Sequence, residues 1–241
     1  MKQDKTIKLA LAAFILLALF ANITFAGIPT NPVITYNISE TAAPRPATYL
    51  NTTGGSFTTL ILNATGQDYK WKAYVGNATG ELALQDQSNY SIYDWRLSTI
   101  SGNVFVSRNN SIDWSNLSCA DRTTLQNEDT YLNINSSMSD SINNTFNSTI
   151  HKSFYASNKI IQNSTCPSIS TYISGTAQNS GETAKFQEIL LKDSRNSMLY
   201  TTILENSVLG FDNNRYDFQM IVAEDETKQT ATTYYFYLEL I

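Results

Sequence analysis

Apolar and polar residues alternate along most of the chain, which predicts antiparallel strands. The clearest run covers residues 69–75, where Tyr69, Trp71 and Val75 share one side and Lys70 lies on the other. A period of two is typical of a strand with one buried face. Further runs of this kind occupy residues 57–62, 91–98, 103–107, 185–192, 198–205, 216–223 and 232–241.

These runs predict a mainly β fold, an antiparallel β-sandwich of the jelly-roll or immunoglobulin type. The runs 91–98 and 103–107 are expected to pair with each other across a turn at Ser101 and Gly102. The final run, residues 232–241, is bulky on both faces. Because such a run is typical of the interior of a sheet, we expect it at the centre rather than at an edge.

One segment, residues 137–161, departs from this alternation. Apolar side chains recur there at every fourth position: Met138, Ile142, Phe146, Ile150 and Phe154. That spacing keeps them on one face of a helix. The sequence therefore predicts one amphipathic helix, with its apolar face against a sheet and glycans on its polar face.

Residues 27–46 are expected to form an extended N-terminal arm. Within the arm, Ile34, Tyr36 and Ile38 alternate with polar residues and predict one short strand with an apolar face. Two prolines before residue 47 then interrupt the strand, because proline has no N–H to donate to a ladder. The three apolar side chains are the candidate donors for strand addition to a neighbouring sheet.

Residues 1–26 have the features of a secretory signal peptide. They combine lysines near the start, an apolar run from Leu9 to Ala21, and small residues before the expected cleavage site. An uncleaved anchor over about residues 9–28 is the alternative. Residues 47–241 contain no second long apolar run, so we expect them to form a single glycosylated β-rich domain without a membrane span.

Asparagines in N-x-[ST] sequons are concentrated in one part of the chain. Eleven such asparagines follow the leader, at Asn37, Asn51, Asn63, Asn77, Asn89, Asn109, Asn116, Asn135, Asn143, Asn147 and Asn163. Three of the sequons share the form N-x-T-G, and glycine and asparagine favour tight turns. The pattern predicts an exported glycoprotein whose glycans lie at turns. The stretch after the last sequon is expected to be core or contact surface.

The chain has two cysteines, Cys119 and Cys166. In an exported protein an isolated pair is expected to form a disulfide. The loop of about 48 residues that it closes would add roughly 4 kcal/mol to the free energy of unfolding. Two free buried thiols are the alternative.

Composition argues against several classes of function. The net charge is −5 and only 15% of residues are charged, whereas nucleic-acid binding needs clustered lysine and arginine. The chain has one histidine, His151, expected on the surface of the helix, and no motif of a hydrolase, zinc protease or nucleotide-binding loop. We therefore expect no catalytic residues, cofactor or metal, and no enzyme.

The three tryptophans are the remaining candidates for ligand contact. Trp71 and Trp95 lie in alternating runs and are expected in the core. Trp114 lies beside Asp113 and Ser115, close to a sequon, and is the candidate for stacking on a sugar ring.

Four runs of the sequence resemble a family of secreted archaeal surface proteins that has no assigned activity. These runs are residues 71–80, 92–95, 216–224 and 234–237. More loosely, the order of leader, extended arm and glycosylated β-rich body is similar to archaeal fibre subunits that assemble by donating a strand. The resemblance implies a place at the cell surface rather than a reaction.

Two functional hypotheses follow. The first is a secreted structural glycoprotein of the cell surface, either an envelope component or a fibre subunit, with further copies of itself or other surface proteins as partners. The second is a monomeric adhesin or carbohydrate-binding module that uses exposed aromatic side chains.

Overall fold

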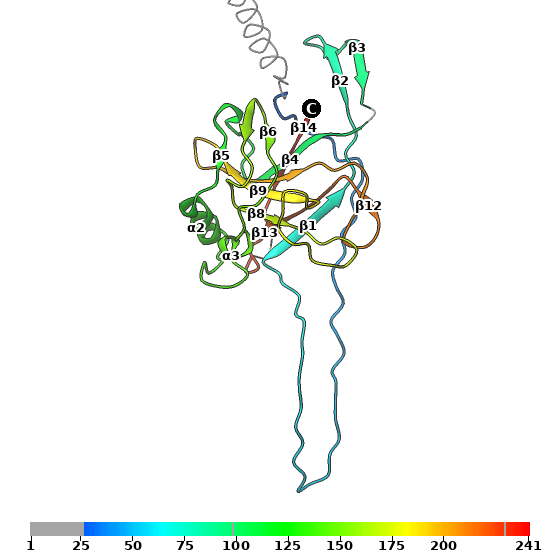
Figure 1. The fold of residues 1–241 in the computed structure, drawn as a ribbon, viewed down its shortest axis with the longest axis vertical. Coiled ribbons are helices and arrows are strands. Elements are labelled where there is room, and N and C mark those ends of the chain that lie inside the picture. The colour runs from blue at the N-terminus through cyan, green and yellow to red at the C-terminus, as the bar shows by residue number, and fades with distance from the viewer. Residues whose placement is uncertain (1–26, 98, 229) are drawn as a thin grey trace, which may run out of the picture.

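The computed structural model describes residues 27–241 apart from residues 98 and 229. The predicted signal peptide, residues 1–26, lies outside this described part. Antiparallel strands dominate the body of the molecule (Figure 1), which confirms the prediction of a mainly β fold. Among the described residues, no helix has both the length and the apolar character needed to cross a membrane.

A six-stranded antiparallel sheet forms the centre of the body. Its strands run in the order β14 (Tyr235–Leu240), β4 (Gly102–Ser107), β10 (Met198–Ile203), β9 (Gln187–Lys192) and β5 (Ser118–Cys119), with β8 (Ser168–Ser170) also paired to β9. The two short strands β5 and β8 share one edge of β9, each pairing with a different part of it. The predicted hairpin of 185–192 and 198–205 is present as β9 and β10.

The central sheet is buried on both faces. One face packs against a two-stranded sheet of β1 (Trp71–Gly76) and β13 (Phe218–Ala223), together with the helices α2 (Arg122–Tyr131) and α3 (Ile142–Thr145). The other face packs against β6 (Phe154–Ala156), β7 (Lys159–Ile161) and the turn η1 (Trp114–Asn116). On β4, Val104 and Val106 enter the first core and Phe105 enters the second, as period-two alternation requires.

Burial on both faces also explains why the final run, residues 232–241, was wrongly predicted at the centre of the sheet. β14 is bulky on both faces because both faces are covered, but it lies at an edge and not at the centre. On its outer side, the described chain pairs with β14 only at Thr30, which forms a bridge with Leu238.

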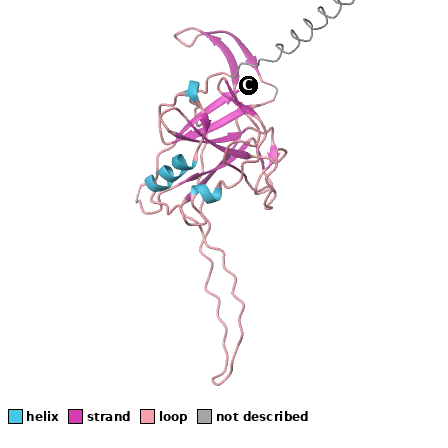
Figure 2. Cartoon of the chain, turned by 60° about the vertical axis from the view of Figure 1, so that its left-hand side comes forward, coloured by secondary structure: helices cyan, strands magenta, loops and turns pink. Residues whose placement is uncertain are grey.

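A hairpin of β2 (Glu81–Gln85) and β3 (Ser91–Arg96) stands away from the body (Figure 2). The sequence predicted that 91–98 would pair with 103–107, and this is wrong. β3 pairs with β2, while β4 pairs with β10 and β14. A further pair of short strands, β11 (Val208–Leu209) and β12 (Arg215–Tyr216), lies in the C-terminal part.

The long helix predicted over residues 137–161 is not formed. Only the four residues of α3 are helical there, and β6 and β7 follow. Ile142 and Phe146 are buried as expected, but Met138 and Ile150 are exposed. Asparagine, serine and threonine are weak helix formers that compete for backbone hydrogen bonds, so the spacing of apolar residues does not suffice for a long helix.

The longer helix is α2, at residues 122–131. Asp121 caps its N-terminus, because its side chain accepts a hydrogen bond from the Thr124 N–H at 2.9 Å. The face that α2 buries includes Thr124, Leu125, Glu128 and Asp129, of which only Leu125 is apolar. The apolar pattern was therefore too weak to predict this helix from the sequence.

Candidate assembly surface

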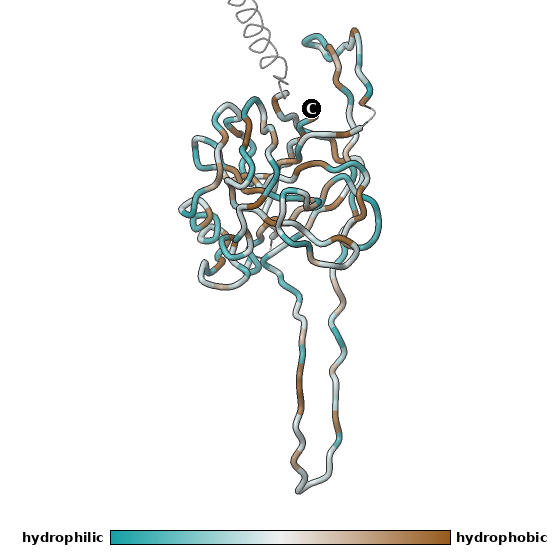
Figure 3. Tube along the Cα trace, viewed as in Figure 1, coloured by the Kyte–Doolittle hydropathy of each residue, from teal (hydrophilic) through white to brown (hydrophobic). Residues whose placement is uncertain are grey.

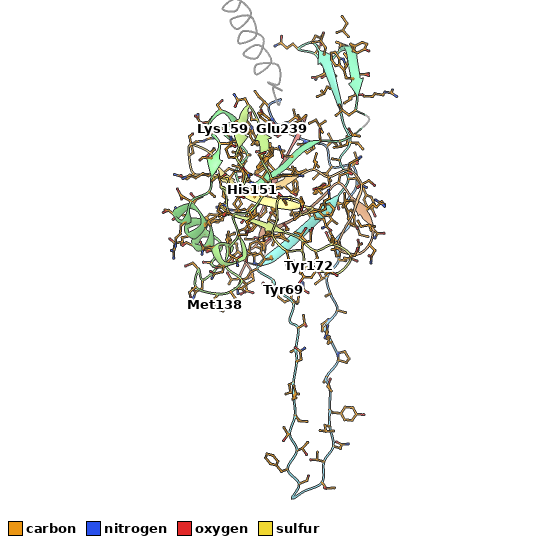
Figure 4. The ribbon with its side chains drawn as sticks, viewed as in Figure 1. Tyr69, Met138, His151, Lys159, Tyr172 and Glu239 are labelled. Carbon is orange, nitrogen blue, oxygen red and sulfur yellow. A yellow bond between two sulfur atoms is a disulfide. The ribbon has the colours of Figure 1, made fainter. Side chains whose placement is uncertain are left out.

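The most exposed part of the chain is the segment 31–69, here called the excursion. It contains no helix or strand, and nearly every side chain in it is exposed. Its two limbs run out from the body to a tip and back (Figure 1), and its side chains extend into open space (Figure 4). At the tip, the Ser56 N–H donates to the Thr53 carbonyl at 3.3 Å, and Gly55 has a φ of 79°.

The candidate donor residues lie on the first limb of the excursion. Ile34, Tyr36 and Ile38 are exposed by 62%, 77% and 78%. The predicted strand is not formed here, because no backbone partner lies beside these residues in the described structure. The second limb differs from prediction in the same way, since residues 57–62 form no strand. Figure 3 shows apolar stretches on both limbs.

A single bridge ties the start of the first limb to the body. The Thr30 N–H donates to the Leu238 carbonyl at 2.9 Å, and the Leu238 N–H donates to the Thr30 carbonyl at 2.8 Å. In an antiparallel ladder the next such pair would join Pro32 to Phe236. Proline has no N–H to donate, so the ladder stops after one rung and the chain leaves the sheet.

All but one of the predicted glycosylation sites are exposed. Ten of the eleven sequon asparagines are exposed. Asn143 is half-buried, because it lies inside α3. Three of the exposed sites, Asn37, Asn51 and Asn63, lie on the excursion.

The predicted disulfide is present between Cys119 and Cys166. Cys119 belongs to β5, and Cys166 lies two residues before β8. The bond therefore joins the two short strands that share one edge of β9.

His151 lies in the interior (Figure 4) and not on a surface helix as predicted. Its Nε2 accepts hydrogen bonds from the N–H groups of Thr165 at 3.2 Å and Cys166 at 3.0 Å. Nε2 therefore carries no proton, and Nδ1 donates to the Lys152 carbonyl at 2.8 Å. Burial lowers the pKa of His151, so the ring is neutral and holds the backbone beside the disulfide.

Two of the three tryptophans, Trp95 and Trp114, lie in surroundings that differ from those predicted. Trp114 packs between Phe105 and Tyr237, with ring centroids 5.2 and 5.0 Å away, and is not free to stack on a sugar. Trp71 is half-buried, as expected for a residue that contacts the core. Trp95 is 51% exposed on β3 and lies edge-on to Tyr93, with centroids 5.0 Å apart.

Two buried carboxyl groups have pKa values displaced upward by burial. The pKa of Glu239 rises to about 7, and the pKa of the fully buried Glu188 rises well above its ordinary value. Asn103 Nδ2 donates to Glu239 at 2.9 Å, and the Ile221 N–H donates to Glu188 at 2.9 Å. These carboxyls satisfy groups inside the protein and do not face a cleft.

The surface is hollowed on one side by the loops that follow β8. The residues that line this hollow are Ile173, Ser174, Thr176, Ala177, Gln178, Asn179, Gly181, Thr183 and Ala184. None of them is titratable. In the part of the chain that the structure describes, no group of three histidine, cysteine, aspartate or glutamate side chains could hold a metal ion.

The excursion, the β2–β3 hairpin and the sheet edges are thus the features that remain for contact with other molecules. Comparison of the chain with models of known protein families, with curated proteins and with solved structures finds no match.

Proposed function

We propose that this protein is a secreted structural glycoprotein of the cell surface that assembles by strand addition. The observation that carries the proposal is the excursion, which presents Ile34, Tyr36 and Ile38 to solvent on an extended backbone without partners. A structureless loop of this length is uncommon in a compact domain unless it has a function. In strand addition the backbone supplies affinity and alternate side chains fill pockets on the acceptor.

Two further observations support a place outside the cell. The disulfide between Cys119 and Cys166 is typical of oxidising compartments. The exposure of ten sequon asparagines leaves room for glycans. The apolar leader and the resemblance to archaeal surface proteins agree with this location.

The triple variant Ile34→Ser, Tyr36→Ser and Ile38→Ser tests the proposal without changing the length of the chain. The mature protein is expected to form oligomers or polymers in size-exclusion chromatography with light scattering, and the variant is expected to remain monomeric. The matched control is Thr35→Ser with Ser39→Thr, which changes polar residues on the same limb, keeps the sequon of Asn37 and should still assemble. Monomers from all three proteins would reject assembly by this segment.

The alternative function is carbohydrate binding by the β2–β3 hairpin. Leu82, Leu84, Tyr93 and Trp95 share one face of this hairpin, and each is at least 44% exposed. Exposed aromatic rings such as those of Tyr93 and Trp95 are suited to stacking on a sugar. Loss of glycan-array binding on Trp95→Ala, but not on Ile92→Ala from the opposite face, would favour this function over assembly alone.

A further inference from the structure

We infer that the outer edge of β1 is the acceptor for residues 57–62 of a second copy of this chain. The inference rests on the proposed assembly by strand addition and deepens it. It assigns the acceptor edge and adds a second donor segment, distinct from the one around Tyr36.

The two edges of the β1–β13 sheet differ in how their backbone groups are satisfied. Three outward groups of β13 are capped by side chains from the rest of the body. The Gln219 carbonyl accepts from Thr202 Oγ1 at 3.1 Å, and the Ile221 N–H donates to Glu188 at 2.9 Å. The Ala223 carbonyl is also capped, because Tyr234 Oη donates to it at 2.7 Å.

The outer edge of β1 has no such caps. The outward groups on this strand belong to Trp71, Ala73 and Val75, which lie opposite the outward residues of β13. Among the described residues, no hydrogen bond reaches the main chain of these three. Ala73 and Val75 are also exposed, so the edge is open to another strand.

Residues 57–62 have the properties of the missing strand. Their sequence is Phe-Thr-Thr-Leu-Ile-Leu, rich in aromatic and β-branched residues that favour sheets. Its apolar side chains are exposed to solvent: Phe57 by 95%, Leu60 by 56%, Ile61 by 97% and Leu62 by 87%. Sequons at Asn51, Asn63 and Asn77 lie outside 57–62 and 71–76, so glycans there would flank a pairing and not obstruct it.

The occupant is a second copy because the segment turns away from its own body. Residues 57–62 lie eight residues before β1 in the chain, and segments that follow one another are usual antiparallel neighbours. In this structure, however, the second limb leaves the body at Tyr69 and extends outward (Figure 4). Residues 57–62 of one copy can therefore pair with β1 of another copy, so that two copies exchange the same segment.

Cysteine cross-linking between two different variants tests the inference. Donor proteins carry Thr59→Cys or Leu60→Cys, adjacent positions that cover both faces of the segment. The acceptor protein carries Val75→Cys, and the control acceptor carries Thr123→Cys on the exposed part of α2. Donor and acceptor are mixed as monomers, allowed to assemble, oxidised, and separated by non-reducing electrophoresis.

We expect a disulfide-linked dimer with Val75→Cys and none with Thr123→Cys. Adding Ala73→Pro to the acceptor should abolish the link, because it removes the outward N–H, whereas Ala73→Ser should preserve it. Assembly without a link at Val75 would overturn the inference and leave the proposed function standing. A further variant carries both Leu60→Cys and Val75→Cys in one chain. A disulfide within this chain, without any link between donor and acceptor proteins, would overturn the inference too, by placing the pairing inside one copy. Absence of assembly in the unmodified protein would overturn both.

Discussion

Single buried polar side chains hold the backbone of this protein where strands do not meet. His151 accepts hydrogen bonds from two N–H groups beside the disulfide, and Glu188 caps an N–H on β13. Each satisfies a main-chain group that would otherwise be buried without a partner, which typically costs about 1–3 kcal/mol. Because both side chains are titratable, these contacts make stability depend on pH.

His151 predicts a loss of stability in acid. Its folded pKa is lowered by burial, so below the unfolded pKa of about 6.5 protons bind the unfolded chain more strongly. Its contribution to the free energy of unfolding is therefore complete above that pH and is lost as the pH falls through the folded pKa. The measurement is urea denaturation of the protein and of His151→Gln at pH 7.5 and 5. We expect the advantage of the natural protein to shrink at pH 5, and an unchanged difference would contradict this role.

Glu239 predicts the opposite dependence. Its folded pKa of about 7 lies above its ordinary value of 4.5, so its contribution is fully present below pH 4.5 and is lost as the pH rises through 7. Glu239→Gln mimics the neutral acid and should raise the free energy of unfolding at pH 8 by on the order of 3 kcal/mol. At pH 4 the two proteins should be equally stable. Thermal unfolding at both pH values measures this, and destabilisation of the variant at pH 8 would be the contrary result.

The partial burial of Asn143 predicts that this sequon is not glycosylated. Asn143 is half-buried inside α3, whereas Asn147 is exposed four residues later. Site-specific mass spectrometry of protein purified from its native cells should find Asn147 glycosylated and Asn143 unmodified. Equal occupancy at the two sites would show that the helix does not limit access.

At the scale of elements, the disulfide secures the weakest edge of the central sheet. β5 and β8 have only two and three residues, too few to pair stably with β9 on their own. Replacing both cysteines by serine should lower the free energy of unfolding by about 4 kcal/mol, because the unfolded chain regains the freedom of a long loop. Denaturation under non-reducing conditions measures the difference, and a loss below about 1 kcal/mol would contradict it.

The alternating pattern predicted the elements better than their partners. It located β1, β9, β10, β13 and β14 because each is buried in part on at least one face. It did not assign β3 to β2, since pairing depends on contacts that no local pattern records. It placed a helix around Phe146 because apolar residues recur there at a helical period, although short turns and strands carry most of them.

The candidate assembly surface was also predicted only in part. Exposure of the donor residues around Tyr36 agrees with their expected availability, but the strand itself needs a partner that a single chain does not supply. Trp95 was predicted in the core and is exposed, whereas Trp114 was predicted as a ligand contact and packs against Phe105. Both tryptophans follow an aspartate in similar local sequences, so only the tertiary packing distinguishes them. The open edge of β1 could not be inferred from the sequence, because it is defined by the caps that β13 has and β1 lacks.

At the scale of the whole molecule, a body stabilised by two cores and one disulfide carries an excursion whose exposed apolar side chains have no strand partner within the described residues. Exposed strands and open edges favour association with other chains. Glycans at the exposed sequons would restrict association to the surfaces that they leave uncovered. These features are the ones on which the proposed assembly by strand addition rests.

Electron microscopy of the purified mature protein tests this central claim most directly. We expect filaments or an ordered lattice from the natural protein, and dispersed single particles from the Ile34→Ser, Tyr36→Ser, Ile38→Ser variant. Dispersed monomers from both proteins would contradict it.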